Sequence, residues 1–207
     1  MLSVVSESPI TANRPVTAKV VAGPVTGTWT VTFKAAAVPG TLAVLAGTLS
    51  AARLDIVSAV IGLSADGTVA DAFDVVPLDG GELEPTDAER LAAAASLALS
   101  GRHDLSAQLA QLRQRHPATS SVAPSVDFQL DSELTTGVRI VCADRPGLLH
   151  DLAAALTAHG LRTRSISVLT FGGRAHDVFR IVDANSNPPK DQRVLGRVRD
   201  DLIAVCG

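Results

Sequence analysis

The residues with the most chemical potential in this sequence form the short segment Asp144-Arg145-Pro146-Gly147, between a strand-like run and an amphipathic helix. The start of a helix presents N–H groups without intrahelical partners and a partial positive charge, so it attracts anions. An aspartate beside it can attract a cation, and glycine lets a ligand approach the backbone closely. The segment therefore offers opposite charges side by side, although its aspartate could also serve only to cap the helix.

A similar segment between a strand and a helix occurs earlier in the chain. Pro39-Gly40 and Pro146-Gly147 lie 107 positions apart, and the same offset aligns the flanking apolar residues. The matched pairs include Val31 and Val138, Leu42 and Leu149, Leu45 and Leu152, Leu49 and Leu156, and Leu54 and Leu161. After a slip of one residue, Asp71 and Phe73 align with Asp177 and Phe179. The chain therefore contains two copies of one structural unit.

Hydrophobic periodicity gives each copy the order strand, helix, strand, strand, helix. In the first copy we expect strands at residues 28–35, 55–64 and 68–76, with a turn at 66–67. The helices are expected from 39 to 53 and from a capping box at Thr86 and Glu89 to Gly101. In the second copy we expect strands at 137–143, 161–171 and 176–183. A helix is expected from Pro146 to Gly160, and a final helix after Asn187-Pro188.

Each copy lacks a closing strand after its last helix but has a strand-like segment ahead of its first strand, at residues 16–21 and 126–131. We therefore predict an α+β protein of two ferredoxin-like βαββαβ units. Each unit has a four-stranded antiparallel sheet, two helices on one face, and an edge strand supplied from before the first strand. The alternative is that residues 126–131 form the fourth strand of the first unit. The expected boundaries are 1–115 for the first unit, with an extra helix at 103–115, 116–124 for a linker, and 125–207 for the second unit.

Composition excludes several classes of function. The 207 residues carry a net charge of −3, have no Tyr and one Trp, and so do not suit a nucleic-acid partner. No apolar run is long enough to span a membrane and no signal peptide is evident, so we expect a cytoplasmic protein. The five His and two Cys have no metal-ligand spacing, and no nucleophile and base are paired. We expect no metal, no cofactor and no catalytic residue, and place Cys142 in the core.

The repeat, with "DRPGLL" between its first strand and first helix, resembles the ACT domain, a small-molecule-sensing module of amino-acid metabolism. The tandem arrangement and the hairpin "SISVLTFGGRAHDVFRIVD" most resemble the C-terminal ACT pair of the bifunctional uridylyltransferase/uridylyl-removing enzyme family. The nucleotidyltransferase and hydrolase regions of that family have no counterpart here. The resemblance therefore implies a stand-alone sensor or a separately encoded regulatory partner of a nitrogen-metabolism enzyme, and not an enzyme.

The resemblance also implies where a ligand binds. In ACT domains a free amino acid lies at the turn from the first strand to the first helix, against a neighbouring domain. Carried onto this chain, Asp144 holds the ammonium or a polar side chain, Pro146 fixes the turn, and the N–H groups around Gly147, Leu148 and Leu149 hold the carboxylate. Ser165, Ile166 and Ser167 supply contacts across the domain pair, and Arg145 is expected at the surface more than on the ligand. Glutamine is the first guess.

The first copy replaces the Asp-Arg pair by Ala37-Val38 and so loses a charge that could hold an ammonium. Loss of a charge-assisted hydrogen bond weakens binding about tenfold to a hundredfold. We therefore expect the first unit to be mainly structural. A ligand-free assembly module is the competing function, and the two units could pair within one chain or again as a homodimer.

Overall fold

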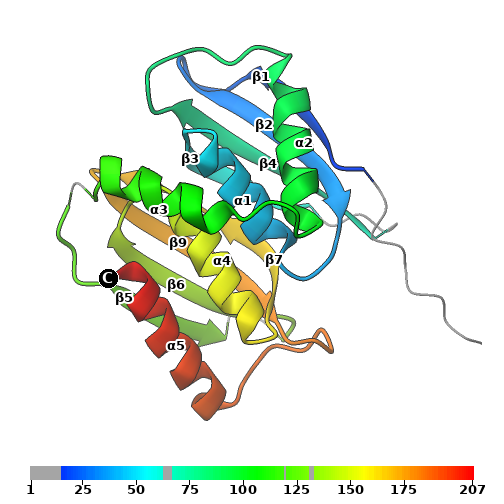
Figure 1. Ribbon diagram of the computed structural model, residues 1–207. Helices are drawn as coiled ribbons and strands as arrows, with labels where there is room; N and C mark the ends of the chain where they lie inside the picture. The colour runs from blue at the N-terminus through cyan, green and yellow to red at the C-terminus, as the bar shows by residue number, and fades with distance from the viewer. Residues whose placement is uncertain (1–14, 63–66, 119, 131–132) are drawn as a thin grey trace, which may run out of the picture.

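The computed structural model describes residues 15–62, 67–118, 120–130 and 133–207, which form two antiparallel sheets with helices on one face of each (Figure 1). Parts of the expected strand 55–64, turn 66–67, linker 116–124 and strand 126–131 lie outside these residues. No helix among the described residues is long and apolar enough to cross a membrane.

The first unit contains four strands and three helices. Its sheet has the order β1-β2-β4-β3, and all neighbouring strands are antiparallel. The elements are β1 (Thr17–Ala22), β2 (Trp29–Ala36), α1 (Thr41–Ala51), β3 (Leu54–Val60), β4 (Thr68–Pro77), α2 (Asp87–Leu99) and the extra helix α3 (Leu105–Arg115).

The second unit repeats this plan with the sheet order β5-β6-β9-β7. Its elements are β5 (Ser125–Leu130), β6 (Thr136–Ala143), α4 (Leu148–Ala158), β7 (Arg162–Ser167), β8 (Thr170–Phe171), β9 (Arg174–Val182) and α5 (Gln192–Cys206). The expected single strand at 161–171 is interrupted at residues 168–169, and the short β8 pairs with β9. The two-unit ferredoxin-like fold is thus confirmed.

The edge strand of each sheet does come from the front of its own unit. β1 pairs with β2, and β5 pairs with β6, where Val126 lies opposite Ile140. The alternative that residues 126–131 complete the first sheet is therefore wrong. Residues 126–131 pair within the second unit for two reasons. Val126 is buried there, and a hairpin to the next strand closes a short loop at little entropic cost.

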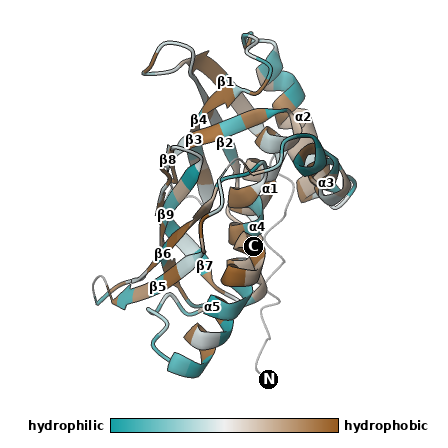
Figure 2. Ribbon diagram, turned by 90° about the vertical axis from the view of Figure 1, so that its left-hand side faces the viewer, coloured by the Kyte–Doolittle hydropathy of each residue, from teal (hydrophilic) through white to brown (hydrophobic). Residues whose placement is uncertain are grey.

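The core lies between each sheet and its helices (Figure 2). Phe33, Phe73 and Phe179 are fully buried, and the rings of Phe33 and Phe73 meet edge to face with centroids 6.3 Å apart. The helix positions matched by the repeat, Leu45, Leu49, Leu152 and Leu156, are also fully buried. The internal repeat is therefore a repeat of core positions.

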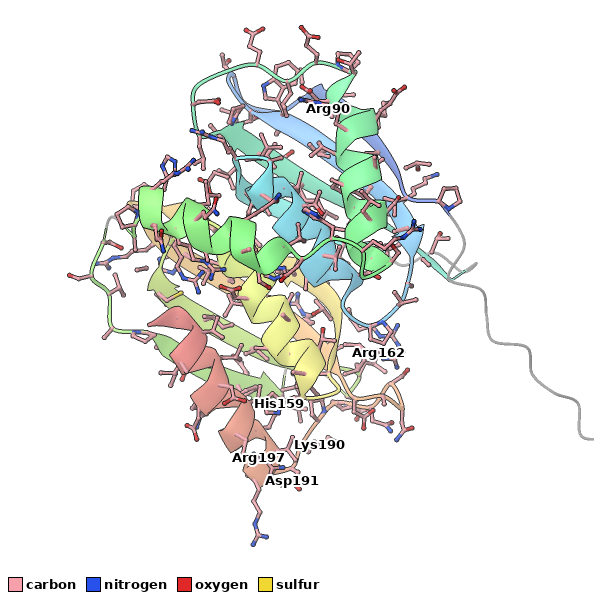
Figure 3. The ribbon with its side chains drawn as sticks, viewed as in Figure 1. Arg90, His159, Arg162, Lys190, Asp191 and Arg197 are labelled. Atoms are coloured by element: carbon pink, nitrogen blue, oxygen red, sulfur yellow. The ribbon has the colours of Figure 1, made fainter. Side chains whose placement is uncertain are left out.

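Of the two expected helix starts, the one at Thr86 is confirmed and the one at Asn187 is wrong. Thr86 is the N-cap position of α2, but its side chain makes no capping hydrogen bond; the carboxylate of Asp87 accepts from the Glu84 N–H ahead of the helix, at 2.8 Å. The last helix begins at Gln192, because the side chain of Asp191 accepts from the Arg193 N–H at 2.8 Å (Figure 3).

The two units pair within the chain. Helix α1 packs beside α4, and the sheet edges β3 and β7 lie next to each other. His150 on α4 hydrogen-bonds through Nδ1 to the Ala43 carbonyl oxygen on α1, at 2.7 Å. Helix α3 packs on α1 and crosses near the upper end of α4 in Figure 1. Segments about a hundred residues apart in sequence thereby meet at the inter-unit interface.

Candidate functional site

The repeated Pro-Gly pair builds the same β-turn in both units. The Leu148 N–H donates to the Arg145 carbonyl at 3.1 Å, and Gly147 has φ 76° and ψ 10°. These are the features of a type II turn, which favours proline at its second position and needs a left-handed residue at its third. Thr41 and Gly40 repeat this geometry in the first unit. Because α4 begins at Leu148, Pro146 precedes the helix and does not lie within its first turn.

The turn of the second unit lines a small cavity of about 20 Å³, which we name the Asp144 corner. It brings together the expected residues Asp144, Arg145, Gly147, Leu148 and Leu149, whereas Ser165, Ile166 and Ser167 do not line it. The remaining lining residues come from the following hairpin and from the first unit: Val168, Thr170, Ala175, Asp177, Ser50, Asp55 and Ile56. The corner is therefore an inter-unit site.

Asp144 does not cap the helix. Its Oδ1 accepts from the N–H of the next residue, Arg145, at 2.9 Å, and the N-cap position is Gly147. Its own N–H donates to the Gly173 carbonyl at 3.0 Å, which fixes the corner against the hairpin turn. Burial, and to a lesser extent the nearby Asp55 charge, raises the pKa of Asp144 to about 6, against hydrogen bonds from Arg145 and Thr170. The carboxylate is thus available to a ligand in the corner.

Asp177 also lines the corner, although the sequence did not lead us to expect it as a site residue. Its side chain is 2% exposed, and no described group hydrogen-bonds its Oδ1. Burial, and to a lesser extent the Asp144 charge, raises its pKa to about 7, against a hydrogen bond from the Leu169 N–H. The available signal was its alignment with Asp71, since an aspartate recurring inside a strand of apolar residues is unusual in a core.

Arg145 is not the exposed residue that was expected. Its side chain is 18% exposed and pairs with Asp151, with Nη1 and Oδ2 at 2.7 Å. Its Nη2 also donates to the Val205 carbonyl near the end of α5, at 2.6 Å. The guanidinium is therefore engaged by α4 and α5, and three aspartates, Asp55, Asp144 and Asp177, dominate the charge of the corner.

The turn of the first unit lines a larger cavity of about 200 Å³, which we name the Gly40 corner. The repeat relates the two corners, because Thr157, Arg162 and Thr163 line this one at positions 107 after Ser50, Asp55 and Ile56. Each corner thus combines the turn of one unit with the helix end and strand start of the other. The residues contributed by the first unit are Ala37, Val38, Pro39, Gly40, Thr41, Leu42, Ile61, Val69 and Asp71.

The Gly40 corner has lost its turn aspartate but keeps a buried carboxylate. Asp71 is 1% exposed and accepts from the Gly62 N–H at 3.2 Å, and burial raises its pKa to about 6. Arg162 from the other unit donates to the Asp183 and Ala184 carbonyls and to Ser186 Oγ (Figure 3). The absence of an aspartate at position 37 therefore does not make this corner apolar.

Three further residues that could carry chemistry have structural roles. His159 hydrogen-bonds Asp201 on α5, with Nε2 and Oδ2 at 2.7 Å, and so links two helices (Figure 3). Cys142 is buried as expected, and Cys206 is buried beside it. Among the residues that the structure describes, no group of His, Cys, Asp and Glu could hold a metal ion.

Comparison with known proteins identifies the family of the second unit. Residues 136–200, from β6 into α5, match the model of the ACT domain family. The second unit is therefore an ACT domain, and the first unit repeats its fold.

The particular relatives are bifunctional uridylyltransferase/uridylyl-removing enzymes. The chain is 33% identical over 198 residues to the bifunctional uridylyltransferase/uridylyl-removing enzyme of Gluconobacter oxydans, covering 92% of this chain and 21% of that enzyme. It is 34% identical over 166 residues to the enzyme of the same name from Azospirillum brasilense, covering 77% of this chain and 18% of that enzyme. The chain thus spans about a fifth of the length of these relatives. Among solved structures, aspartate kinase from Synechocystis aligns with 77% of this chain and 24% of its own, at 19% identity and a TM-score of 0.41.

Proposed function

We propose that this ACT pair is a regulatory sensor that binds a free amino acid at the Asp144 corner. The observation that carries the proposal is the buried carboxylate of Asp177, whose Oδ1 has no hydrogen-bond partner among the described groups. A buried polar atom without a partner costs free energy, and a ligand that donates to it recovers that cost. The atom lies in the same corner as Asp144 and the start of α4.

The corner offers a partner to each end of an amino acid. Asp144 and Asp55 are suited to the α-ammonium group, because both are carboxylates at the cavity. The start of α4 is suited to the α-carboxylate. Since the Leu148 N–H already donates to Arg145, the N–H groups of Gly147 and Leu149 are the better candidates there.

Asp177 is suited to accept a hydrogen bond from the side chain of the ligand. A carboxylate next to two others attracts a hydrogen-bond donor and repels a negative charge. We therefore propose an amino acid with an amide or another donor in its side chain, with glutamine as the first candidate, and not an acidic one. The similarity to the uridylyltransferase/uridylyl-removing enzymes supports a role in controlling a nitrogen-metabolism enzyme.

The test is thermal unfolding of the protein with each standard amino acid at millimolar concentration. A ligand that binds the native state alone must raise the melting temperature. We expect a rise with at least one donor-bearing amino acid, loss of that rise in Asp144→Asn and Asp177→Asn, and its retention in Asp200→Asn, which changes an exposed aspartate. If no amino acid raises the melting temperature, the sensor proposal is wrong.

The competing proposal is a ligand-free interaction module. The observation in its favour is the size of the Asp144 corner, since about 20 Å³ corresponds to the space of one water molecule. An amino acid cannot enter unless the corner opens. The same unfolding experiment separates the two functions, because an interaction module shows no stabilisation by any amino acid.

A further inference from the structure

The two turns differ in what packs against them. Helix α3 lies between α2 of the first unit and β5 of the second. It packs along α1 and reaches the turn of the second unit, where Arg113 donates to the Pro146 carbonyl. Residues of α3 line neither cavity, so α3 meets the Asp144 corner through the turn and not through the cavity itself. The internal repeat therefore provides a matched comparison of one turn in contact with α3 and one turn that, among the described residues, is not.

Arg113 ties α3 to the corner by polar contacts. Its Nη2 lies 2.8 Å from Oδ1 and 2.7 Å from Oδ2 of Asp151, in the first turn of α4. Its Nε donates to the Pro146 carbonyl within the turn itself, at 3.3 Å. Asp151 also pairs with Arg145, so one carboxylate connects α3 to the turn. The side chain of Arg113 is 32% exposed, which places the contact at the edge of the packed region.

Leu109 adds an apolar contact at the same turn. Its side chain is fully buried, and a Cβ placed on Gly147 would lie 3.2 Å from its Cδ2 and 3.1 Å from Arg113 Nη2. Among the described residues, the equivalent Cβ on Gly40 would meet a Thr157 methyl alone, at 4.0 Å. Helix α3 is thus in direct contact with one turn and not, within the described part of the chain, with the other.

The cavity volumes follow this difference. The Asp144 corner measures about 20 Å³ and the Gly40 corner about 200 Å³, although both are built from matched positions of the repeat. The larger side chains of the second turn, Leu148 in place of Thr41 and Asp144 in place of Ala37, also reduce the space. Helix α3 adds to their effect, because its contacts hold the turn against the first unit.

We propose that α3 is a strap that holds the Asp144 corner closed, with Arg113 as its positioning residue. This inference rests on the proposed function, since it concerns how an amino acid gains entry to that same site. If the closed form dominates, the apparent affinity is lowered in proportion to the population of the open form. Ligand binding then shifts α3 away from the turn, and the linker between the units carries the response.

Closure can be tested without any ligand, by amide hydrogen exchange of residues 147–152 in the full chain. Arg113→Ala removes all three contacts of the guanidinium, and we expect exchange in this turn to become roughly fivefold faster, as for the loss of one well-formed ion pair. Arg115→Ala is the matched control, because it removes an exposed arginine from the same helix. Arg113→Gln, which keeps the stem, serves if the alanine variant does not fold. Equal exchange in the Arg113 and Arg115 variants would overturn the strap.

Affinity measured by calorimetry with glutamine separates this inference from the proposed function. We expect Arg113→Ala to bind roughly fivefold more tightly than Arg115→Ala, because less free energy is spent on opening the corner. Binding of equal strength in both variants contradicts the strap and leaves the sensor in place. Faster exchange in Arg113→Ala without binding of glutamine or any other standard amino acid contradicts the sensor and leaves closure by α3 in place.

Discussion

Three aspartates lie around the Asp144 corner, and burial works against the charge of each. Burial is the largest influence on the pKa values of Asp55, Asp144 and Asp177, and raises all three. The charges of Asp55 and Asp144 add to the shifts of their neighbours. Such groups are retained at the expense of stability and are common where a site has to bind a charged group.

The first prediction concerns the stability of the protein against pH. The native pKa values of Asp71 and Asp144 are about 6 and that of Asp177 about 7, above the ordinary value of 3.8. At pH values between 3.8 and the native pKa values, the native state binds more protons than the unfolded state, so stability falls as pH rises. We expect the free energy of unfolding in urea to be about 1–3 kcal/mol higher at about pH 5.5 than at about pH 7.5.

Two variants identify the source of that dependence. Asp177→Asn keeps the shape of the side chain and an oxygen that can accept from Leu169, but removes the titrating group. It should therefore reduce the difference in stability between the two pH values, while Asp200→Asn should leave it as in the parent protein. A full pH dependence in Asp177→Asn would show that this carboxyl group does not cause it.

Ligand affinity should depend on pH in the opposite sense. An ammonium group binds the ionised form of Asp144, and its pKa of about 6 means that the carboxylate is lost as the solution is acidified. We expect the affinity for glutamine, measured by calorimetry, to fall about tenfold from about pH 7.5 to about pH 5. Affinity that is constant over this range would mean that Asp144 does not hold the ammonium.

The residue scale also shows what a motif can predict. Gly147 could be placed from the Pro-Gly pair, because a type II turn needs a left-handed residue at its third position, and Asp144 could be singled out by its charge beside that turn. Asp177 was visible as one member of a repeated pair, but its unpartnered oxygen depends on how the hairpin packs. Asp55 comes from the other unit, and nothing in its local sequence points to the corner. Local chemistry was predictable, whereas contributions across the interface were not.

At the scale of elements, the order of strands was predictable and the starts of helices less so. The edge strands β1 and β5 followed from alternation and from the missing closing strand. The capping bond expected at the start of α2 did not, because Thr86 lies at the N-cap position but has φ −65° and ψ −22°, already helical, and its side chain makes no capping bond. An N-cap residue needs a non-helical backbone, and a sequence pattern does not show which of several polar residues has it.

The start of α2 provides the second stability prediction. Asp87→Ala removes the acceptor of the Glu84 N–H, so it should cost about 1 kcal/mol, as for the loss of other caps. Thr86→Ala, at the position that the capping-box pattern indicated, should cost a few tenths of that. Both are measured by urea denaturation at neutral pH. The opposite order would restore Thr86 as the capping residue.

At the scale of the whole molecule, the pair of units is held together by close packing of α1 on α4. Gly47 on α1 lies where a Cβ would be 2.6 Å from His150 Nδ1 and 3.0 Å from Leu105 Cδ1. It is therefore the point at which α4 and α3 both approach the helix of the first unit. The sequence did not show whether the two units pair within one chain, because the apolar stripes of α1 and α4 suit a core or an interface equally well.

Gly47 and Gly196 form a matched pair for testing this interface, since both lie inside helices. Alanine is favoured over glycine there by roughly 0.5–1 kcal/mol, so Gly196→Ala, which meets nothing within 4 Å, should raise the free energy of unfolding by about that amount. Gly47→Ala should instead lower it by about 1–3 kcal/mol, because the added methyl group forces His150 away from its bond to Ala43 and displaces Leu105. Urea denaturation of both variants gives the two free energies of unfolding. Equal stabilisation by the two substitutions would mean that α4 does not approach α1 closely in solution, and that the two units are held together by other contacts.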